Sequence, residues 1–538
     1  MKSNANMTNA SILSSEQLQQ EVERLLALIS TQATTIESLR HQLNLFRHAR
    51  FGRKTEKDVV HEQMVLQFDE AQASDEPELV AEVNSSDEQS ETITYTRAKK
   101  GTGRKALPKS LPYIENIYDL NDEEKQCACG CALTHIGDDV SEQLDIVPQM
   151  TFRVVNIRKK YACKGCEETI RSAKLPKQPI EKSIAAPGLI SAVIDSKFNH
   201  HTPLYRLERI FADAGVPVTR ATLGNWLIKA AGLLTPLVKL MEANIQEHDI
   251  AFADETPLQV LREKDRSPTS KSYMWLFIGG PPDKRAYVYQ YHQTRSAQVA
   301  ANFFADFNGY LHADCYSAYV ALDKLAHIHH VACWAHARRY FVDVTKCSQK
   351  KTGLSHQVIK LIAELYFLEK QLKEQAATPE AIYQRRQAEA MPIIVKLKAL
   401  IDENLYKILP KSPLAKAVHY LLTHWQALNR YLEDGRLEID NNRTERSIKP
   451  FVIGRKNWLF HGNDLGAQAG SILFSLIETC KQHSINVFSW LKYVLTNIHQ
   501  AKTLEQLESL LPYNINTNLL ENMRNIPELI FPDKGVVN

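Results

Sequence analysis

Three acidic positions that lie far apart in the chain are the residues best suited to chemistry. Asp254 ends the apolar run "IAFAD", and Asp314 ends the run "GYLHAD". A third acid comes from the polar segment "IDNNRTERS" at 439–447, which offers Asp440 or Glu445. Carboxylates that converge without a neutralising partner raise one another's pKa, and they persist most easily around divalent cations. Oxygen ligands favour Mg²⁺ or Mn²⁺, and two such ions about 4 Å apart can assist phosphodiester cleavage.

The residue after the first acid is also acidic, but it is the weaker candidate. Glu255 follows Asp254 directly, so in a strand it would point to the opposite face. Taken alone, Asp254 or Asp314 is more simply a capping or ion-paired surface carboxylate. The catalytic interpretation therefore depends on all three acids meeting.

Clustered cysteines predict a second metal site. "CACGC" supplies Cys127, Cys129 and Cys131, and "YACKGC" supplies Cys163 and Cys166. Two such groups suit a tetrahedral structural Zn²⁺ site with four thiolate ligands. Cys163 and Cys166 are the firm pair, and Cys127 joins them with Cys129 or, alternatively, Cys131. The other reading is a set of reduced cysteines without a metal.

The acids require a sheet to position them. "IAFADETPLQVL", "KSYMWLFIGG" and "RAYVYQYHQ" predict three strands in a meander. A helix, a strand ending at Asp314, a second helix, a further strand and the start of a third helix follow, up to about residue 346. This alternation predicts a mixed, layered α/β sheet. Residues 350–435 are helical in pattern and interrupt it before the polar segment.

The N-terminal segment predicts self-association. Apolar residues from Leu18 to Phe46 recur at heptad spacing, broken only by Gln32, so we expect a coiled coil over residues 14–50 that joins copies of the chain. A single amphipathic helix packed on its own domain is the alternative. The linker at 51–110 is first acidic and then basic, and its Arg104 and Lys105 either lie along phosphates or are simply solvated.

Residues 184–232 have the spacing of a helix-turn-helix. "TPLYRLERIFADAG" predicts one helix, "VPVT" a tight connection and "RATLGNWLIKAAG" a second helix capped by Thr219. Arg220, at the start of that second helix, is a candidate for DNA contact. Helix pairs of this kind also occur as plain structural hairpins.

Four blocks around the acids resemble the insertion-sequence-66 family of bacterial transposases. They are "DETP" at 254–257, "HADCYSAY" at 312–319, "CWAHARR" at 333–339 and "DNNRTERSIKPFVIGRKNWLFHGN" at 440–463. The heptads, the cysteine groups and the closing "SLIETCKQHSINVFSWLKYVL" also match that family's layout. The resemblance implies a ribonuclease H-like catalytic domain with a helical insertion. It also implies an Asp-Asp-Glu triad that falls on Asp254, Asp314 and Glu445 and binds two Mg²⁺ or Mn²⁺ ions.

The same blocks supply candidates for DNA binding. Asp440 is too far round a helix to share the face of Glu445, so it is predicted to be a cap or an outer-shell acid. Helical geometry places Arg446 and Lys449 near substrate phosphates. Further candidates, which could equally have structural roles, are His336, Arg338, Arg455, Lys456 and Trp458.

The expected fold is therefore multidomain α+β, with a ribonuclease H-like α/β core. The expected domains are the coiled coil at 14–50, the linker at 51–110, a zinc-binding module at 111–180, a helix-turn-helix-like region at 181–245, the core at 246–348 and 437–492, its helical insertion at 349–436 and a tail at 493–538. The expected function is Mg²⁺-dependent cleavage and strand transfer of transposon ends into target DNA. A zinc-dependent DNA-binding regulator with an inactive catalytic domain and a nuclease of the same fold are the alternatives.

Bulk composition agrees with this reading but does not establish it. The 538 residues are 44% hydrophobic and 24% charged, with a net charge of only +3, as in ordinary globular proteins. No run approaches the ~18 apolar residues that span a bilayer, and the N-terminal residues lack the apolar core of a secretory signal. We expect a cytoplasmic, nucleoid-associated bacterial protein that forms homo-oligomers and does not bind membranes. The resemblance adds accessory proteins of the same element as partners.

Overall fold

The structure is a computed structural model, and it describes residues 23, 24, 32, 150–157, 160–162, 170–172, 176–346, 352–525 and 527. Glu23, Arg24 and Gln32 are helical, as expected for the heptad segment. The rest of the predicted coiled coil lies outside the described residues. So do the linker with Arg104 and Lys105, and the five candidate zinc ligands Cys127, Cys129, Cys131, Cys163 and Cys166. The strands β1 (Lys160–Ala162) and β2 (Ile170–Ser172) pair in antiparallel fashion.

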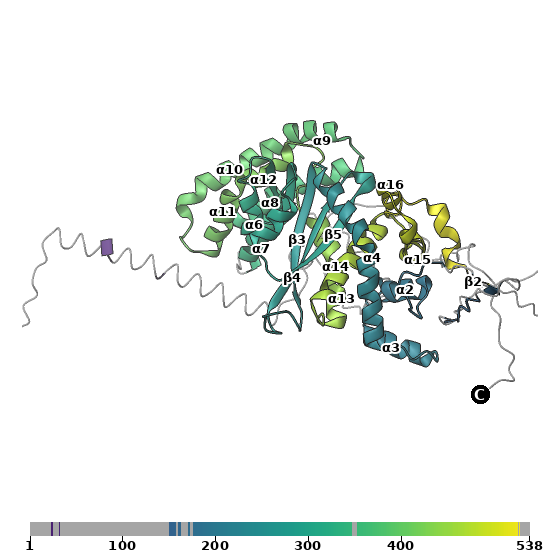
Figure 1. Cartoon of the computed structure of the whole chain (residues 1–538). Helices are drawn as coiled ribbons and strands as arrows, with labels where there is room; N and C mark the ends of the chain where they lie inside the picture. The colour runs from purple at the N-terminus through teal and green to yellow at the C-terminus, as the bar shows by residue number, and fades with distance from the viewer. Residues whose placement is uncertain are drawn as a thin grey trace, which may run out of the picture. The chain divides into compact units, whose positions relative to one another are not determined.

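A five-stranded mixed sheet forms the centre of the fold (Figure 1). Its strands are β3 (Ile250–Gln259), β4 (Lys271–Gly279), β5 (Ala286–His292), β6 (Gly309–Ala313) and β7 (Ile328–Ala332). The strand order is β5-β4-β3-β6-β7; the first three strands are antiparallel, and β6 and β7 run parallel to β3. The predicted meander and the following alternation of helices and strands are confirmed, and the described fold is mixed α+β.

Helices cover the sheet on both sides. Figure 1 shows α13 and α14 on one side of the β3–β4 hairpin and α6 and α7 on the other. Contacts join α14 to β5 and α13 to β3. The bounds of these helices are α5 (Ala297–Phe303), α6 (Ser317–Leu322), α7 (Trp334–Lys346), α13 (Asn442–Trp458) and α14 (Asp464–Gln482). The short 3-10 helix η3 (Pro282–Lys284) joins β4 to β5.

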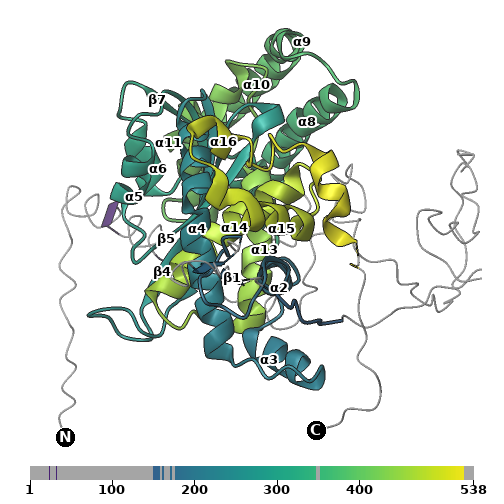
Figure 2. The same ribbon diagram turned by 45° about the vertical axis from the view of Figure 1, so that its right-hand side comes forward.

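The predicted helix-turn-helix differs from the observed structure at its second helix. After α2 (Pro187–Ile194) and the π-helical η2 (Asp195–Asn199), the pair consists of α3 (Leu204–Asp213) and α4 (Arg220–Gln246). Thr219 accepts the Thr222 amide, as the capping prediction requires. However, α4 runs on past the predicted end near residue 232, because apolar residues continue at helical spacing and become buried. It packs against α14 and β5, so it belongs to the core (Figure 2).

The segment between α7 and α13 is helical, as predicted. It contains α8 (Leu354–Glu374), α9 (Pro379–Arg385), η4 (Arg386–Ala390), α10 (Met391–Asn404), η5 (Leu405–Lys407), α11 (Pro413–Thr423), α12 (Trp425–Asn429) and η6 (Arg430–Leu432). The helices α8 and α11 pack on α7, and α12 packs on β7. The insertion therefore rests on the β7 side of the sheet.

The predicted C-terminal tail is largely folded onto the body. It contains the end of α15 (Val487–Asn497), η7 (Ile498–Gln500), α16 (Leu504–Glu508) and η8 (Thr517–Arg524). The helix α15 packs on α2, and the Lys492 ammonium donates to the Met523 carbonyl at 2.7 Å. Apolar residues at helical spacing, such as Leu491, Val494 and Leu495, are buried and hold this segment in place. Among the described helices, none combines the length and the apolar character needed to cross a membrane.

Candidate active site

The first two acids come from neighbouring strands. In the parallel register of β3 and β6, Phe252 pairs with His312, and Asp254 and Asp314 each follow two residues later. Asp254 ends the apolar run but not the strand, because β3 continues to Gln259 and stays paired with β4, within the predicted strand "IAFADETPLQVL". The strand β6 has ended by then, so beyond Phe252 no strand pairs with β3 on that side, and the next backbone contact there is the bridge between Val260 and His461 at the far end of β3. Both acids are therefore at the edge where β6 stops.

The loop that carries Asp314 is held by hydrogen bonds. The carboxylate accepts the Tyr316 amide at 3.0 Å, and the Asp314 carbonyl lies 3.1 Å from Nε2 of His330. Burial lowers the pKa of His330 to about 4, so its ring is neutral at neutral pH. A neutral, buried imidazole donates to the carbonyl without adding charge beside the acids.

The third acid arrives on a helix whose start is fastened to the sheet. The helix α13 begins at Asn442, so the polar segment is the start of a helix, as predicted, and Glu445 lies in its first turn. The buried Asn441 donates from Nδ2 to the Ala253 carbonyl at 3.0 Å, and its amide donates to Sγ of Cys333 at 3.3 Å. The start of α13 is thus fixed by two contacts, one with Ala253 beside Asp254 and one with Cys333 at the β7–α7 junction.

Asp440 makes the contacts of a helix cap, the role predicted for it. Its carboxylate accepts the Asn442 amide at 3.1 Å and the Asn442 side-chain amide at 2.7 Å. It is only 8% exposed, and burial raises its pKa above the usual value for aspartate. Asp440 therefore serves the start of α13, and Glu445 is the other acid that the polar segment supplies.

The electrostatics of Asp254 link the three acids. The pKa of Asp254 is raised to about 8, chiefly by burial and in smaller part by the charges of Glu255, Asp314 and Glu445, against an opposing hydrogen bond from the Glu255 amide. Glu255 itself is occupied, because the Arg295 guanidinium and the Tyr319 hydroxyl both donate to its carboxylate. Asp254 thus has the carboxylates of Asp314 and Glu445 within electrostatic reach, and no Lys or Arg of the described residues pairs with it.

The donor chemistry fits a hard divalent cation. Asp254, Asp314 and Glu445 offer only oxygen, and their mutual repulsion is the condition that Mg²⁺ or Mn²⁺ relieves. As they stand, the residues that the structure describes contain no group of three His, Cys, Asp or Glu that could hold an ion. The Glu445 carboxylate instead lies 3.6 Å from Nε2 of His336 on α7. The charges are thus near one another without forming a closed metal cage.

The predicted DNA-binding residues divide into accessible and inaccessible ones. Arg446, Lys449 and Lys456 are exposed on α13, and Arg455 and Arg338 are half-buried. Arg455 donates to the Thr256 hydroxyl at 3.3 Å. Arg220 is exposed on α4 but forms an ion pair with Glu208 at 3.0 Å.

Trp458 does not have the predicted access to DNA. Its ring is only 9% exposed and lies against the rings of Phe451 and Phe474. It packs over Gly454, one turn earlier on α13, where a side chain would collide with the ring. Of the two roles considered for Trp458, DNA contact and core packing, the structure supports core packing.

A buried ion pair positions the approach to α13, and the sequence patterns missed it. Arg386 donates from Nε and Nη2 to the two carboxylate oxygens of Glu369, both at 2.8 Å. The same guanidinium donates to the carbonyls of Tyr431, Asp434 and Leu437. It therefore fastens the helical insertion to the chain just before the polar segment. Nothing in the spacing of Glu369 and Arg386 along the sequence signals this pairing.

Comparison with known families accounts for most of the chain. The family described as "Transposase IS66 family" matches residues 182–469, and "IS66 C-terminal element" matches residues 475–513. The N-terminal part matches "zinc-finger binding domain of transposase IS66" at residues 124–167 and "Transposase C of IS166 homeodomain" at residues 38–115. The first match contains all three acids, and the third contains all five clustered cysteines.

Three relatives from Sinorhizobium fredii (strain NBRC 101917 / NGR234) extend the similarity. The uncharacterized protein y4jD is 36% identical over 76% of this chain and 81% of its own length. Protein y4qI is 31% identical over 93% of both chains, and y4hP is 27% identical over 89% of this chain and 87% of its own. None of these names states an activity. Since the principal family match spans more than half of the chain and encloses the three acids, the protein belongs to the IS66 family of transposases and carries that family's zinc-finger domain.

Proposed function

We propose that this chain is a DNA transposase of the Asp-Asp-Glu type, with Asp254, Asp314 and Glu445 as its catalytic acids. One observation carries the proposal. The half-buried Asp254 and Asp314 each lie two residues past the paired positions Phe252 and His312 of neighbouring strands, and Asn441 ties the start of α13, whose first turn carries Glu445, to the Ala253 carbonyl beside Asp254. In this arrangement the charges of Asp314 and Glu445 contribute to the raised pKa of Asp254. Residues separated by up to 191 positions along the chain (445 − 254) thus act on one carboxylate.

The sheet supports a ribonuclease H-like core. Three antiparallel strands are followed by two strands parallel to the first, and the first strand is central. The acids come from β3, from the residue after β6 and from a helix that returns to β3 after the insertion. This arrangement is the one that the family resemblance leads us to expect.

The three acids would hold two Mg²⁺ or Mn²⁺ ions. When bound, these ions would supply activation of the attacking oxygen and charge stabilisation of the leaving one. Cleavage adds water at a phosphorus and breaks its bond to O3′, which frees a 3′-hydroxyl. In strand transfer that hydroxyl attacks a target phosphorus, so one phosphodiester replaces another. Arg446 and Lys449, exposed on α13, would bind the phosphates near this centre.

The remaining modules would organise the DNA. The heptad segment would pair subunits so that two transposon ends are held together, and accessory proteins of the same element would join them. The zinc module, with Cys163, Cys166 and Cys127 plus Cys129 or Cys131, would recognise those ends together with the basic stretch around Arg104 and Lys105. The protein would act in the bacterial cytoplasm, associated with the nucleoid.

Substitution of the helix-borne acid tests the proposal. Glu445→Gln should still bind duplex DNA that carries the element's terminal repeat, but Mg²⁺-dependent nicking should fall by about a hundredfold or more, the order observed when a group that stabilises transition-state charge is removed. Glu403→Gln, which changes an exposed acid on α10, is the matched control and should nick like the wild type. Full nicking by Glu445→Gln would refute the triad.

Two further measurements separate the alternatives. A nuclease of the same fold would nick end DNA but give no joined product in a strand-transfer assay with labelled ends. A DNA-binding regulator with an inactive core would bind the ends and show no nicking at any Mg²⁺ or Mn²⁺ concentration.

A further inference from the structure

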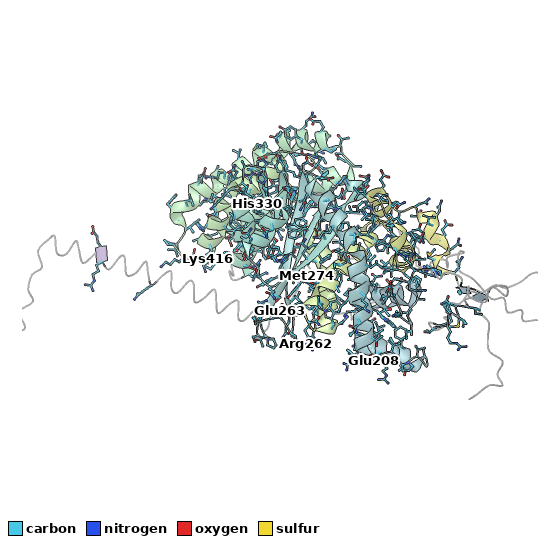
Figure 3. All side chains as sticks on the ribbon, viewed as in Figure 1. Glu208, Arg262, Glu263, Met274, His330 and Lys416 are labelled. Atoms are coloured by element: carbon cyan, nitrogen blue, oxygen red, sulfur yellow. The ribbon has the colours of Figure 1, made fainter. Side chains whose placement is uncertain are left out.

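A groove of about 460 Å³ lies between the β3–β4 hairpin and the C-terminal end of α13. The chain that follows α13 is joined to the hairpin: His461 donates to the Gln259 carbonyl at 2.9 Å, and Leu261 donates back to His461 at 3.0 Å. Arg262, in the hairpin loop beside α13 in Figure 3, donates to the Gly462 carbonyl at 3.2 Å. The two walls of the groove are therefore fastened to each other.

The charge of the groove suits a polyanion. Lys271 lies on one wall, and Arg455 and Lys456 lie on the other, while no acidic residue is among the lining residues. Within the described ranges, none of these three cations forms an ion pair with a carboxylate. Their charge is therefore available to phosphates, and the remaining lining, which includes Pro257 and Leu258, is apolar or uncharged.

A strained leucine stands at the edge of this groove. Leu459 has φ 69° and ψ −52°, and the Phe460 amide donates across it to the Trp458 carbonyl at 2.9 Å, which closes a γ-turn. A branched residue at positive φ is strained and persists only where its surroundings impose it. Here two neighbours impose the positive φ of Leu459. Trp458 is buried on one side, and His461 on the other side is hydrogen-bonded to the β3–β4 hairpin. Yet the Leu459 side chain is 64% exposed, so its own burial does not explain the strained geometry.

We propose that the groove binds one strand of the end DNA and that Leu459 is an apolar wedge that unstacks its bases. Cations that hold the backbone beside an inserted apolar side chain are the means by which proteins open base steps. This inference rests on the proposed function, because it requires DNA to extend from the three catalytic acids along β3 and α13 to the groove. Leu258 lies four residues beyond Asp254, roughly 14 Å along the strand at ~3.4 Å per residue. Because each nucleotide of a duplex strand advances ~3.4 Å along the helix axis, the wedge acts about four base steps from the cleaved bond.

Fluorescence of 2-aminopurine tests the wedge. The base analogue is placed at successive positions near the cleavage site in duplex DNA carrying the terminal repeat, and zinc-loaded full-length protein is added in buffer without Mg²⁺ or Mn²⁺, so that nothing is cut and the zinc module stays intact. We expect a fluorescence rise, which reports unstacking, centred about four steps from the cleaved bond. A rise only at the cleaved bond itself, or no rise on bound DNA, would overturn the wedge.

Two substitutions at one position separate the wedge from folding. Leu459→Gly removes the side chain and relaxes the γ-turn, so the protein should melt no lower than the wild type while the fluorescence rise falls by about half or more. Leu459→Ala should lose the same signal without relaxing the turn. Leu504→Ala, which truncates a leucine that is 60% exposed on α16, is the control and should leave the signal unchanged. A full fluorescence rise with Leu459→Gly would overturn the proposal.

The cations and the cleavage reaction complete the test. The double variant Lys271→Ala, Lys456→Ala should flatten the slope of log K against log salt by about 0.9 for each lost phosphate contact. An unchanged slope would overturn the groove as the DNA path. Nicking by the same wild-type preparation in Mg²⁺ distinguishes the two proposals: nicking without unstacking overturns the wedge alone, and the absence of both overturns both.

Discussion

At the scale of single residues, the acids near the site differ in whether their carboxylates already have hydrogen-bond or ion-pair partners. Glu255 and Asp440 lie beside the proposed catalytic acids in sequence, but Glu255 is bound by Arg295 and Tyr319, and Asp440 caps α13. In the part of the chain that the structure describes, Asp254 has no such cation or hydroxyl partner, and its carboxylate accepts only the Glu255 amide. Its burial beside two further acids makes it the group whose protonation should report the site.

The raised pKa of Asp254 predicts a pH-dependent stability. Between its ordinary value of 3.8 and about 8, the folded state holds a proton that the unfolded state has lost. Stability should therefore fall as pH rises through this window, by at most about 1.4 kcal/mol per pH unit. Asp254→Asn should melt higher than the wild type at pH 8, and the difference should shrink towards pH 4. Mg²⁺ should raise the wild-type melting temperature at pH 8 more than that of the variant.

The measurement is thermal melting across this pH range, with Asp213→Asn, an exposed acid at the end of α3, as the control. A stability difference between Asp254→Asn and the wild type that stayed constant with pH would show that Asp254 does not carry the raised pKa.

At the scale of elements, the position of α13 is the decisive feature. Its start is tied to β3 by Asn441 and to the β7–α7 junction by Cys333. The chain that enters it is tied to the insertion by Arg386. The insertion therefore contributes to where Glu445 lies, although it supplies none of the three acids.

Removal of one partner of the buried Arg386–Glu369 pair should be severe. Arg386→Met leaves the Glu369 carboxylate and three carbonyls without their donor, and we expect a loss of about 3–5 kcal/mol of folding free energy. The double variant Arg386→Met, Glu369→Leu should recover much of that loss, because no buried charge remains. Denaturant unfolding measures both.

The adjacent Arg385 gives the matched control. It pairs with Glu389 at the surface, so Arg385→Met should unfold like the wild type. If Arg386→Met were equally harmless, the insertion would not be holding the segment that enters α13.

At the scale of the whole molecule, the chain combines an α/β body with an N-terminal zinc-finger domain of the same family. The body has its own core, which runs from α2 through the sheet to η8. Its cysteines, Cys315, Cys333 and Cys480, are free thiols within the described residues. The predicted zinc ligands all lie in the family's zinc-finger match.

Loss of one firm zinc ligand should therefore affect the module without unfolding the body. Cys163→Ser should abolish the zinc measured by elemental analysis of the purified protein, because a structural site needs all four ligands. End-DNA binding should weaken, while the melting transition of the body is retained. Cys347→Ser, a cysteine outside the clusters, is the control. Retention of full zinc by Cys163→Ser would remove Cys163 from the ligand set.

What the sequence by itself determined is local. Alternation and apolar runs predicted β3 to β7 in order, the Thr219 cap and the helical insertion, because these patterns depend on neighbouring residues. The helix that begins at the polar segment was expected from the family resemblance. The identities of the three proposed acids also came from motifs in the sequence.

Only the tertiary structure decided what depends on contacts between distant residues. Packing against α14 and β5 makes α4 a core helix, and the space over Gly454 buries Trp458. The Arg386–Glu369 pair and the groove beneath Leu459 have the same origin. Their partners come together only when the chain folds, so no periodicity in the sequence encodes them.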